Sequence, residues 1–331
     1  MEIRRKKILV TGGAGFIGSH LVDELSMNNH VIILDNFSSG ERGNISHHEG
    51  RDNVVVMEGD IRDKNLLERA FNDIDIVYHL AVQCIRSSIK DPGFNHEVNA
   101  TGTLNLLMKS LEHSVERFVY VSSSEIYGTA IRVPMNEEHP WKPTTVYGAS
   151  KLAGELYTLA YNETYGLKSM VIRPFNTYGP REHLHGVYGE VIPRFVLRLL
   201  SGLPPVIFGD GSQTRDFTYV SDTVKGIVAA SECDDMIGQY VNVARGQEVS
   251  INELAGIIAG RLGRSDINPI YEMQRPGDVL RHYADISKAK KMFDFNPDVD
   301  IKKGIGLYID WFLSQNYDIL QLMNQEVIFN W

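Results

Sequence analysis

Cysteine is scarce in this sequence, and the two cysteines lie far apart. Cys84 and Cys233 are the only thiols among 331 residues, and neither belongs to a CxxC pair. This pattern disfavours both a disulfide framework and a cysteine-ligated zinc site, and we expect no bound metal. Such sparse use of thiols is typical of a reducing compartment, so we expect a cytoplasmic protein.

The chain also lacks an excess of basic residues and a long apolar run. It has 33 Lys and Arg against 42 Asp and Glu, which gives a formal net charge of −9. We expect no nucleic-acid partner, because binding to phosphate backbones needs a basic footprint, although a few convergent arginines can hold a small anion. We also expect no membrane partner, because no apolar stretch approaches the ~20 residues of a membrane span. The short apolar run at 8–10 meets Gly12 and Gly13 at once, unlike a signal peptide.

What is present is a regular alternation of short strands and helices over the first 175 residues. Strands rich in Val and Ile are predicted at 7–10, 31–34, 54–57, 74–80, 118–122 and 169–172. Helices are predicted at 16–28, 64–71, 94–113 and 146–165. The alternation indicates right-handed βαβ units, and therefore an α/β fold with a Rossmann-type doubly wound parallel sheet.

The rhythm changes after Pro174. Helical patterns joined by turns rich in Gly and Pro follow at 190–201, 219–232, 250–262, 286–293 and 301–315. We therefore predict a Rossmann domain at 1–175 and a smaller, mainly substrate-binding C-terminal lobe at 176–331. Part of 217–245 should return to the first domain, because 240–244 has the pattern of a buried strand. We expect the apolar residues of the tail, 317–331, to pack.

A glycine motif joins the first strand to the first helix. Gly12, Gly15 and Gly18 form a GxxGxxG variant of the dinucleotide fingerprint. They allow, in turn, a tight turn, the approach of a pyrophosphate to helix N-terminal amides, and close packing of helix on strand. Asp35 ends the second strand 20 residues after Gly15, where a carboxylate would accept both ribose hydroxyls of NAD and repel a 2′-phosphate. Arg42 is nearby in the sequence and could favour NADP, but the spacing of Asp35 favours NAD.

Tyr147 and Lys151 lie at i and i+4 of a predicted helix and share one face. An ammonium beside a phenol lowers the phenol pKa, so Tyr147 can act as a base near neutral pH. A lone YxxxK is more often an exposed Tyr and Lys on a helix. Here it accompanies a Rossmann start and three serines, which lie 23 to 25 residues upstream at a strand end, and the combination favours the catalytic interpretation.

The sequence resembles the extended short-chain dehydrogenase/reductase superfamily, in its nucleotide-sugar epimerase/dehydratase branch. The matching motifs are TGGAGFIGSH (11–20), YHLA (78–81), SSSEIYG (122–128), YGASK (147–151), RPFNTYGP (173–180), GDGSQTRDFTYVSD (209–222) and RPGDVLRHYADISKA (275–289). Together they span nearly the whole chain. The resemblance implies that a bound NAD oxidises the sugar and is later reduced back, while the second lobe holds the nucleotide.

The resemblance also implies roles for individual residues. Ser123 and Tyr147 would contact the sugar 4-hydroxyl, and Lys151 would hold the nicotinamide ribose. The implied cofactor contacts are Gly12, Gly15, Phe16, Ile17, Gly18, Asp35, Asn36, Asp60, Ile61, Leu80, Ala81, Asn99, Tyr147, Lys151 and Pro174, with Asp60 and Ile61 flanking the adenine. The implied substrate contacts are Arg86, Asn176, Glu190, Arg215, Arg275 and Asp278. Arginine forks suit a diphosphate, although an ion pair of Arg215 with Asp216 is a competing interpretation.

Glu125 distinguishes the reactions within this resemblance. The 4-epimerases usually have a small residue here, whereas 4,6-dehydratases and UDP-glucuronate decarboxylases usually have Glu. A carboxylate there can take the C5 proton once C4 is a ketone, unless it points to solvent. Ser124 stands where dTDP-glucose dehydratases have an acidic Asp, which leaves the general acid open. The segment 275–282 is more like that of epimerases, so the two signals conflict.

We therefore predict first an NAD-dependent nucleotide-sugar 4,6-dehydratase, whose catalytic residues are Ser123, Ser124, Glu125, Tyr147 and Lys151. A 4-epimerase like UDP-glucose 4-epimerase comes second and a UDP-glucuronate decarboxylase third. The non-enzyme alternative, an NAD-sensing regulator on the same fold, has little reason to keep Ser123, Tyr147 and Lys151 together. The substrate could be a UDP-, dTDP- or GDP-sugar. The helices at 94–113 and 146–165 resemble the dimer bundle of the family, which predicts a homodimer.

Overall fold

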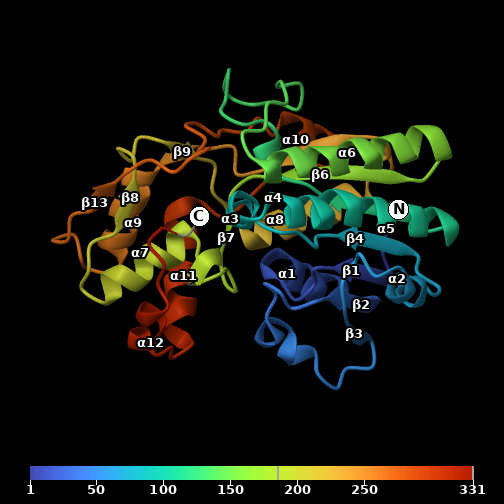
Figure 1. The fold of residues 1–331 in the computed structure, drawn as a ribbon, viewed down its shortest axis with the longest axis horizontal. Helices are drawn as coiled ribbons and strands as arrows, with labels where there is room; N and C mark the ends of the chain where they lie inside the picture. The colour runs from blue at the N-terminus through green and yellow to red at the C-terminus, as the bar shows by residue number, and fades with distance from the viewer. Residues whose placement is uncertain (185, 330–331) are drawn as a thin grey trace.

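The computed structural model describes residues 1–184 and 186–329, and a seven-stranded parallel sheet lies at its centre (Figure 1). From edge to edge the strands are β11 (Tyr240–Val243), β6 (Ser169–Pro174), β5 (Arg117–Val121), β4 (Ile76–His79), β1 (Lys7–Thr11), β2 (His30–Asp35) and β3 (Val54–Glu58). The strand order runs outward in both directions from β1 and β4, and ligands of such sheets bind at the carboxyl ends of the strands beside this switch point. The predicted Rossmann-type fold is confirmed.

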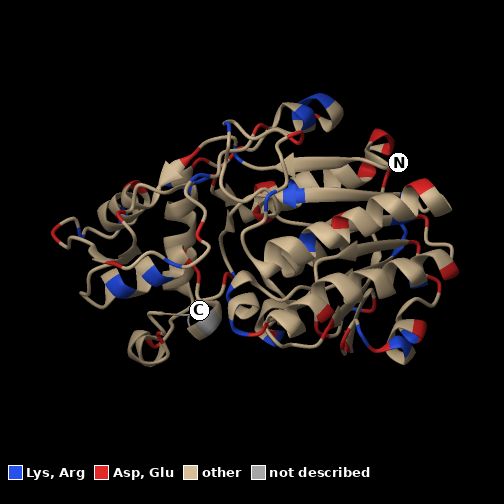
Figure 2. Cartoon of the chain, turned by 45° about the horizontal axis from the view of Figure 1, so that its top comes forward, with Lys and Arg blue, Asp and Glu red and all other residues tan. Residues whose placement is uncertain are grey.

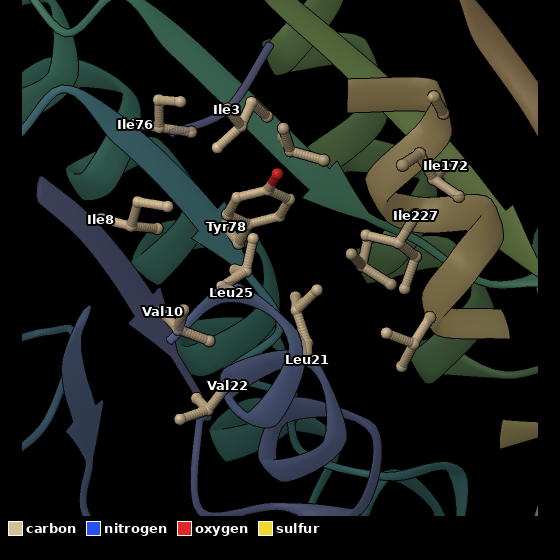
Figure 3. Close-up of a cluster of buried hydrophobic side chains, with 14 of the residues drawn as sticks. Ile3, Ile8, Val10, Leu21, Val22, Leu25, Ile76, Tyr78, Ile172 and Ile227 are labelled. Carbon is tan, nitrogen blue, oxygen red and sulfur yellow. The ribbon is translucent and has the colours of Figure 1, made fainter. Parts of the chain in front are cut away.

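Helices cover both faces of the sheet, because successive residues of a strand point to opposite faces. On one face Ile8, Val10 and Tyr78 pack with Leu21 of α1, as Figure 3 shows. On the other face Leu9 belongs to a separate core beneath α2 and α5. The helices of this half are α1 (Phe16–Leu25), α2 (Lys64–Ala70), α3 (Ile85–Lys90), α4 (Pro92–His96), α5 (Gly102–Glu112), α6 (Val146–Tyr165), α8 (Val220–Glu232) and α10 (Ser287–Phe293).

The remaining helices form a second lobe with its own buried core, on the left in Figure 1. They are α7 (Val191–Leu200), α9 (Ile251–Arg261), α11 (Ile301–Ser314) and α12 (Ile319–Asn324), beside the strand pair β8 (Val206–Phe208) and β13 (Ile270–Glu272). Two further pairs are β7 (Thr177–Tyr178) with β10 (Thr218–Tyr219) and β9 (Thr214–Arg215) with β12 (Val249–Ser250). Basic and acidic residues are both spread along the outer helices and loops (Figure 2).

Two late segments return to the sheet. α8 packs against α1 and β6, and β11 pairs with β6 as an edge strand. α10 also packs there, on α8 and β11. The sequence interpretation assigned only part of 217–245 to this half and left α10 in the second lobe. Phe295 joins the sheet core just after α10, so the return is held by burial of apolar surface.

The predicted helix at 94–113 is present, with a π-helical turn inside it. The chain forms α4, then a π-helical turn at Glu97–Thr101, and only then α5. The Asn99 amide nitrogen donates to the Gln83 carbonyl at 3.0 Å and to the Asn95 side-chain oxygen at 3.2 Å, and its oxygen accepts from the Gln83 amide at 2.8 Å. These tertiary bonds favour the wider turn over a regular helix.

The tail packs only in part. Leu322 of α12 is buried in the second lobe, as expected, but Leu320 is 76% exposed and the prediction is wrong for it. α12 has only six residues, and it packs one face against the lobe while its other face is exposed. Within residues 1–184 and 186–329, no helix combines the length and apolarity that crossing a membrane requires.

Candidate active site

A cavity of about 360 Å³ lies at the carboxyl ends of the central strands. The structure brings most of the predicted cofactor residues to its wall: Gly12, Gly15, Phe16, Ile17, Gly18, Asp35, Asn36, Asp60, Ile61, Leu80, Ala81, Tyr147, Lys151 and Pro174. Asn99 does not line it. Instead, Asn99 holds the backbone of Gln83, which does line the cavity and follows β4. Asn99 therefore positions the wall in this structure.

The glycine turn forms a cradle that side chains would fill. Gly12 has φ +71°, and a Cβ there would lie 2.7 Å from the Ala81 amide nitrogen. A Cβ at Gly18 would lie 2.1 Å from the Gly12 carbonyl oxygen, so α1 can approach the turn only without it. A Cβ at Gly15 would point to open space except for that oxygen at 3.2 Å. The start of α1 thus leaves room and unpaired amides for a pyrophosphate, and the residues present fit a dinucleotide.

Asp35 is fixed at the end of β2. Its carboxylate accepts from the Ala14 amide at 2.9 Å and from the Phe37 amide at 2.8 Å. Burial raises the pKa of Asp35, and these two hydrogen bonds oppose the increase. Arg42, the residue that could favour NADP, lies over the Phe37 ring at 4.2 Å and pairs with Glu58. The cavity wall at this point therefore presents a carboxylate, as NAD requires.

Asp60 is held more tightly than the sequence interpretation implied. Its two oxygens accept from Arg62 Nε and Nη2, each at 2.9 Å, and Asn36 donates to it at 3.2 Å. Hydrogen bonds from Arg62 are the main cause of its lowered pKa. The adenine amino group would therefore have to donate to a carboxylate that Arg62 already orients.

Ser123 and Tyr147 meet at the end of β5. The Ser123 hydroxyl accepts from the Glu125 amide at 3.2 Å, and Ser123 lowers the pKa of the Tyr147 phenol, an effect that burial outweighs. Tyr147 stands in the first turn of α6, where Thr145 accepts from the Gly148 amide at 3.1 Å. The helix cap therefore fixes the height at which the phenol enters the cavity.

The Lys151 side chain contacts β5. Its ammonium donates to the Val121 carbonyl at 2.7 Å and lies 4.2 Å above the centre of the Tyr120 ring. Burial lowers the pKa of Lys151 to about 7 and raises the pKa of Tyr147. Burial is the largest cause of the Tyr147 shift in this structure, so a lowering of the phenol pKa by Lys151 stays a prediction.

Glu125 lies between two cavities. It lines the main cavity and also a polar cavity of about 110 Å³ that contains Arg86, Arg215 and Arg275. Burial raises the pKa of Glu125, with the Arg215 charge next in size and opposing it. The carboxyl thus faces the site rather than solvent. Ser124 beside it is buried and lines the main cavity.

The predicted substrate residues surround the polar cavity. Its lining includes Arg86, Asn176, Glu190, Arg215, Arg275 and Asp278. Arg215 pairs with Asp278 at 2.7 Å and not with Asp216, which instead accepts from the Arg245 and Gly246 amides at 3.0 Å. The competing interpretation of Arg215 is therefore wrong.

Two buried polar atoms of Arg86 and Asn176 lack a hydrogen-bond partner within the part of the chain that the structure describes. They are Nε of Arg86 and the side-chain oxygen of Asn176. Arg86 otherwise pairs with Glu190, and this pair outweighs the effect of burial and lowers the Glu190 pKa. Buried polar atoms are usually paired, so these two indicate a place for a polar ligand.

Sequence reasoning missed one basic residue of the site. Arg194 of α7 lines a neighbouring cavity of about 130 Å³ together with Phe208, Arg215 and Arg275. Burial lowers the pKa of Arg194 to about 10. The sequence signal was a charged residue within the apolar run 191–200, where a buried arginine needs a partner.

Known proteins of three named activities resemble this chain. The family model described as GDP-mannose 4,6 dehydratase matches residues 9–307. A UDP-glucose 4-epimerase of Mycolicibacterium smegmatis is 38% identical over 315 residues, which cover 94% of this chain and 99% of that protein. UDP-glucuronic acid decarboxylase 1 of Xenopus tropicalis is 35% identical over 327 residues, which cover 95% and 74%. A solved dTDP-glucose 4,6-dehydratase of Streptomyces venezuelae, with NAD and TYD bound, has a TM-score of 0.87 and 32% identity over 93% and 97% of the chains.

The matched region spans both lobes and includes the glycine turn, Tyr147, Lys151 and Arg275. The relatives are named for three different reactions, so the comparisons identify the family and leave the reaction open. The chain belongs to the extended short-chain dehydrogenase/reductase superfamily, in its family of NAD-dependent nucleotide-sugar epimerases and dehydratases.

Proposed function

We propose that this protein is an NAD-dependent nucleotide-sugar 4,6-dehydratase. The proposal rests on Glu125, a carboxyl with a raised pKa that faces the site from the end of β5. Its neighbours include the Tyr147 phenol, whose pKa Glu125 helps to raise. A base next to a 4-ketosugar can remove the proton at C5, because the ketone acidifies that carbon.

The first step belongs to Tyr147. Its phenolate takes the proton of the sugar 4-hydroxyl, and the Ser123 hydroxyl orients both oxygens. A bound NAD would supply the acceptor for the C4 hydride and the source of the hydride at C6, and its positive charge would lower the pKa of the Tyr147 phenol. Lys151 would hold the nicotinamide ribose, so its ammonium has to exchange the Val121 carbonyl for a ribose oxygen.

The second step belongs to Glu125. It takes the C5 proton and delivers that proton to the C6 hydroxyl, which leaves as water. Ser124 supplies only a hydroxyl, so one carboxyl serves as base and then as acid. C5 is finally protonated from solvent, and the product is a 4-keto-6-deoxy sugar.

The nucleotide is proposed to lie in the polar cavity. Arg215 and Arg275 provide the charge that a diphosphate needs, and Asp278 orients Arg215. The same residues suit UDP-, dTDP- and GDP-sugars, because all three carry a diphosphate. We further propose that two copies of the chain assemble as a homodimer.

A 4-epimerase is the second candidate, favoured by the similarity to the Mycolicibacterium smegmatis epimerase and by the epimerase-like segment at 275–282. In that reaction the 4-ketosugar rotates within the site and hydride returns to the other face of C4. Glu125 then has no proton to remove. A decarboxylase would require a uronic acid substrate and would release carbon dioxide.

Product mass and a Glu125→Gln variant distinguish these reactions. Purified protein is incubated in D₂O with a panel of UDP-, dTDP- and GDP-hexoses, and the products are analysed by mass spectrometry and NMR. We expect a product that has lost water and has one deuterium at C5. In Glu125→Gln the rate of water loss should fall by roughly 10²–10⁴-fold, as for removal of a general base. The variant should still reduce bound NAD.

Ser124→Ala is the matched control, because Ser124 neighbours Glu125 and also lines the cavity. We expect it to retain dehydration. A product of unchanged mass from a fully active Glu125→Gln variant would refute the dehydratase and favour the epimerase.

A further inference from the structure

A short segment beside the main cavity is tied to the Rossmann half at three points. We call residues 179–184, which follow β7, the strap. Glu182 and His183 of the strap line the main cavity. The cavity is also lined by the turn that starts α1 and by Ser38, Ser39 and Gly40 of the loop after β2. The strap and these elements therefore enclose the place where the dinucleotide is proposed to lie.

Two of the three ties are hydrogen bonds from histidines to carbonyl groups. His183 Nε2 donates to the Ser39 carbonyl at 3.1 Å, and both residues line the cavity, so this bond joins the strap directly to the loop after β2. His20 of α1 donates through Nε2 to the Pro180 carbonyl at 2.9 Å. Because a carbonyl only accepts, the neutral Nε2–H form is sufficient for both bonds.

The third tie is an ion pair. Arg181 Nη1 lies 2.8 Å from Asp23 Oδ2. Both side chains are partly buried, at 21% and 32% exposure, which limits screening by salt. The other oxygen of Asp23 accepts from His47 at 2.6 Å and from His48 at 2.7 Å. His47 and His48 thus orient the Asp23 carboxylate independently of the strap.

The backbone of Arg181 supports a specific role for its side chain. Arg181 has φ +67°, in the left-handed region that glycine occupies at no steric cost. An arginine held there is strained, and such strain persists only where surrounding contacts compensate for it. The contact that the Arg181 side chain itself makes is the one with Asp23.

We propose that Arg181 and Asp23 are positioning residues that hold the strap over the cofactor and so set the rate at which NAD leaves. This inference rests on the proposed binding of NAD in the main cavity. Neither residue lines that cavity, so they act through Glu182 and His183, which do. The enzyme consumes and restores NAD in each turnover, and slow release keeps the cofactor in place between turnovers.

Cofactor release can be measured without any sugar. The purified chain is loaded with NAD and mixed with an excess of NADH, and the fluorescence of bound NADH reports the rate at which NAD leaves. We expect release from Arg181→Gln to be ~5–10-fold faster than from the native chain, as for loss of one charged contact. Arg181→Lys, which keeps the charge, should restore most of the slow release. Asp23→Asn should add little when Arg181 is already Gln, because the two residues act as one pair.

The dependence on salt separates this role from a general effect on the fold. Release from the native chain should accelerate between ~0.05 and ~0.5 M salt, and release from Arg181→Gln should respond much less. Arg261→Gln is the matched control, because Arg261 makes an Arg–Asp pair of 2.7 Å with Asp310 in the second lobe. That variant should release NAD at the native rate.

The outcomes are distinguishable. Native rate and native salt response in Arg181→Gln, in a chain that binds NAD, would overturn the inference and leave the proposed function intact. Equally fast release from Arg261→Gln would overturn it too, because the effect would then not be specific to the strap. A native chain that binds neither NAD nor NADH would refute both the inference and the proposed cofactor.

Discussion

The phenol of Tyr147 is buried between Ser123 and the chain around Glu125, and burial raises its pKa. Ser123 partly opposes this increase, so we treat Ser123 and Tyr147 as one proton-transferring unit in the proposed mechanism. A residue type therefore indicates which group can react, whereas its protonation depends on partners that the sequence does not place.

At the residue scale, Tyr147→Phe tests this unit. The variant loses one hydroxyl and keeps the ring that fills the site, so we expect its thermal stability and NADH binding to stay close to those of the native chain. Turnover of the nucleotide sugar should fall by ~10²–10⁴-fold, which is the usual contribution of a general base. Steady-state rates beside a fluorescence titration with NADH would check this. Native turnover in the variant would remove Tyr147 from the mechanism.

Lys151 gives a prediction about pH. Its pKa is about 7 in the folded chain, against ~10.4 for an ordinary lysine, so between these values the unfolded chain holds a proton that the folded chain has lost. Stability without cofactor should therefore rise with pH across this window, by up to roughly 1.4 kcal/mol per pH unit from this group. Below pH 7 both states are protonated and the cost of burying the charge is fully present.

The measurement is urea unfolding of the NAD-free chain at several pH values between ~7.5 and ~9.5. Lys151→Met should remove this group's contribution to the slope of the unfolding free energy against pH. The exposed Lys64 provides the control, because Lys64→Met should keep the native slope. Equal slopes for the native chain and Lys151→Met would show that the buried amine does not titrate in this range.

At the scale of elements, the start of α6 lies directly against the short turn that carries Glu125. A Cβ added at Gly148 would lie 2.6 Å from the Glu125 carbonyl oxygen. Gly148→Ala should therefore push α6 away from the turn and separate Tyr147 from Ser123. We expect stability to fall by about 1–3 kcal/mol, as for overpacking, and turnover to fall with it.

Gly256 is the matched control for this prediction. It also lies in a helix, α9, but a Cβ there would meet no atom within 4 Å. Gly256→Ala should raise stability by about 0.5–1 kcal/mol, because a helical glycine costs conformational entropy, and should leave turnover unchanged. Thermal unfolding and activity of both variants would check the pair. A fully active and stable Gly148→Ala would contradict the close approach.

The elements that the sequence predicts are those with a regular pattern. Strands such as β1 and helices such as α6 repeat their burial at a fixed period, and the glycine turn between β1 and α1 has a steric signature. The π-helical turn at Glu97–Thr101 and the strand pair β7–β10 have no such signal, because each depends on contacts far away in the sequence. The same holds within the site: Asp35 follows from spacing, whereas the contacts of Lys151 and Asp60 depend on how neighbouring elements pack.

At the scale of the molecule, the return of α8 and α10 to the sheet joins the two halves by several chain crossings. β9 and β10, which precede α8, belong to the second lobe and bring Arg215 to the polar cavity, while Glu125 and Tyr147 come from the Rossmann half. Residues from both halves therefore line a continuous site.

The surface of the Rossmann half predicts how whole molecules associate. α5 and α6 pack side by side, and their outward faces expose Met108 at 42%, Leu111 at 38% and Leu156 at 44%. Met108 and Leu111 are about one turn apart and share a face of α5. Two such helix pairs facing each other would bury these side chains in a four-helix bundle, and apolar burial favours this at ~25 cal/mol per Å².

Light scattering after gel filtration should give twice the monomer mass, and the double variant Met108→Lys/Leu156→Asp should give the monomer. Leu320→Asp, which changes an even more exposed leucine in the other lobe, should leave the dimer intact. A monomeric native chain would rule out this assembly, and dissociation by Leu320→Asp alone would place the interface on the second lobe.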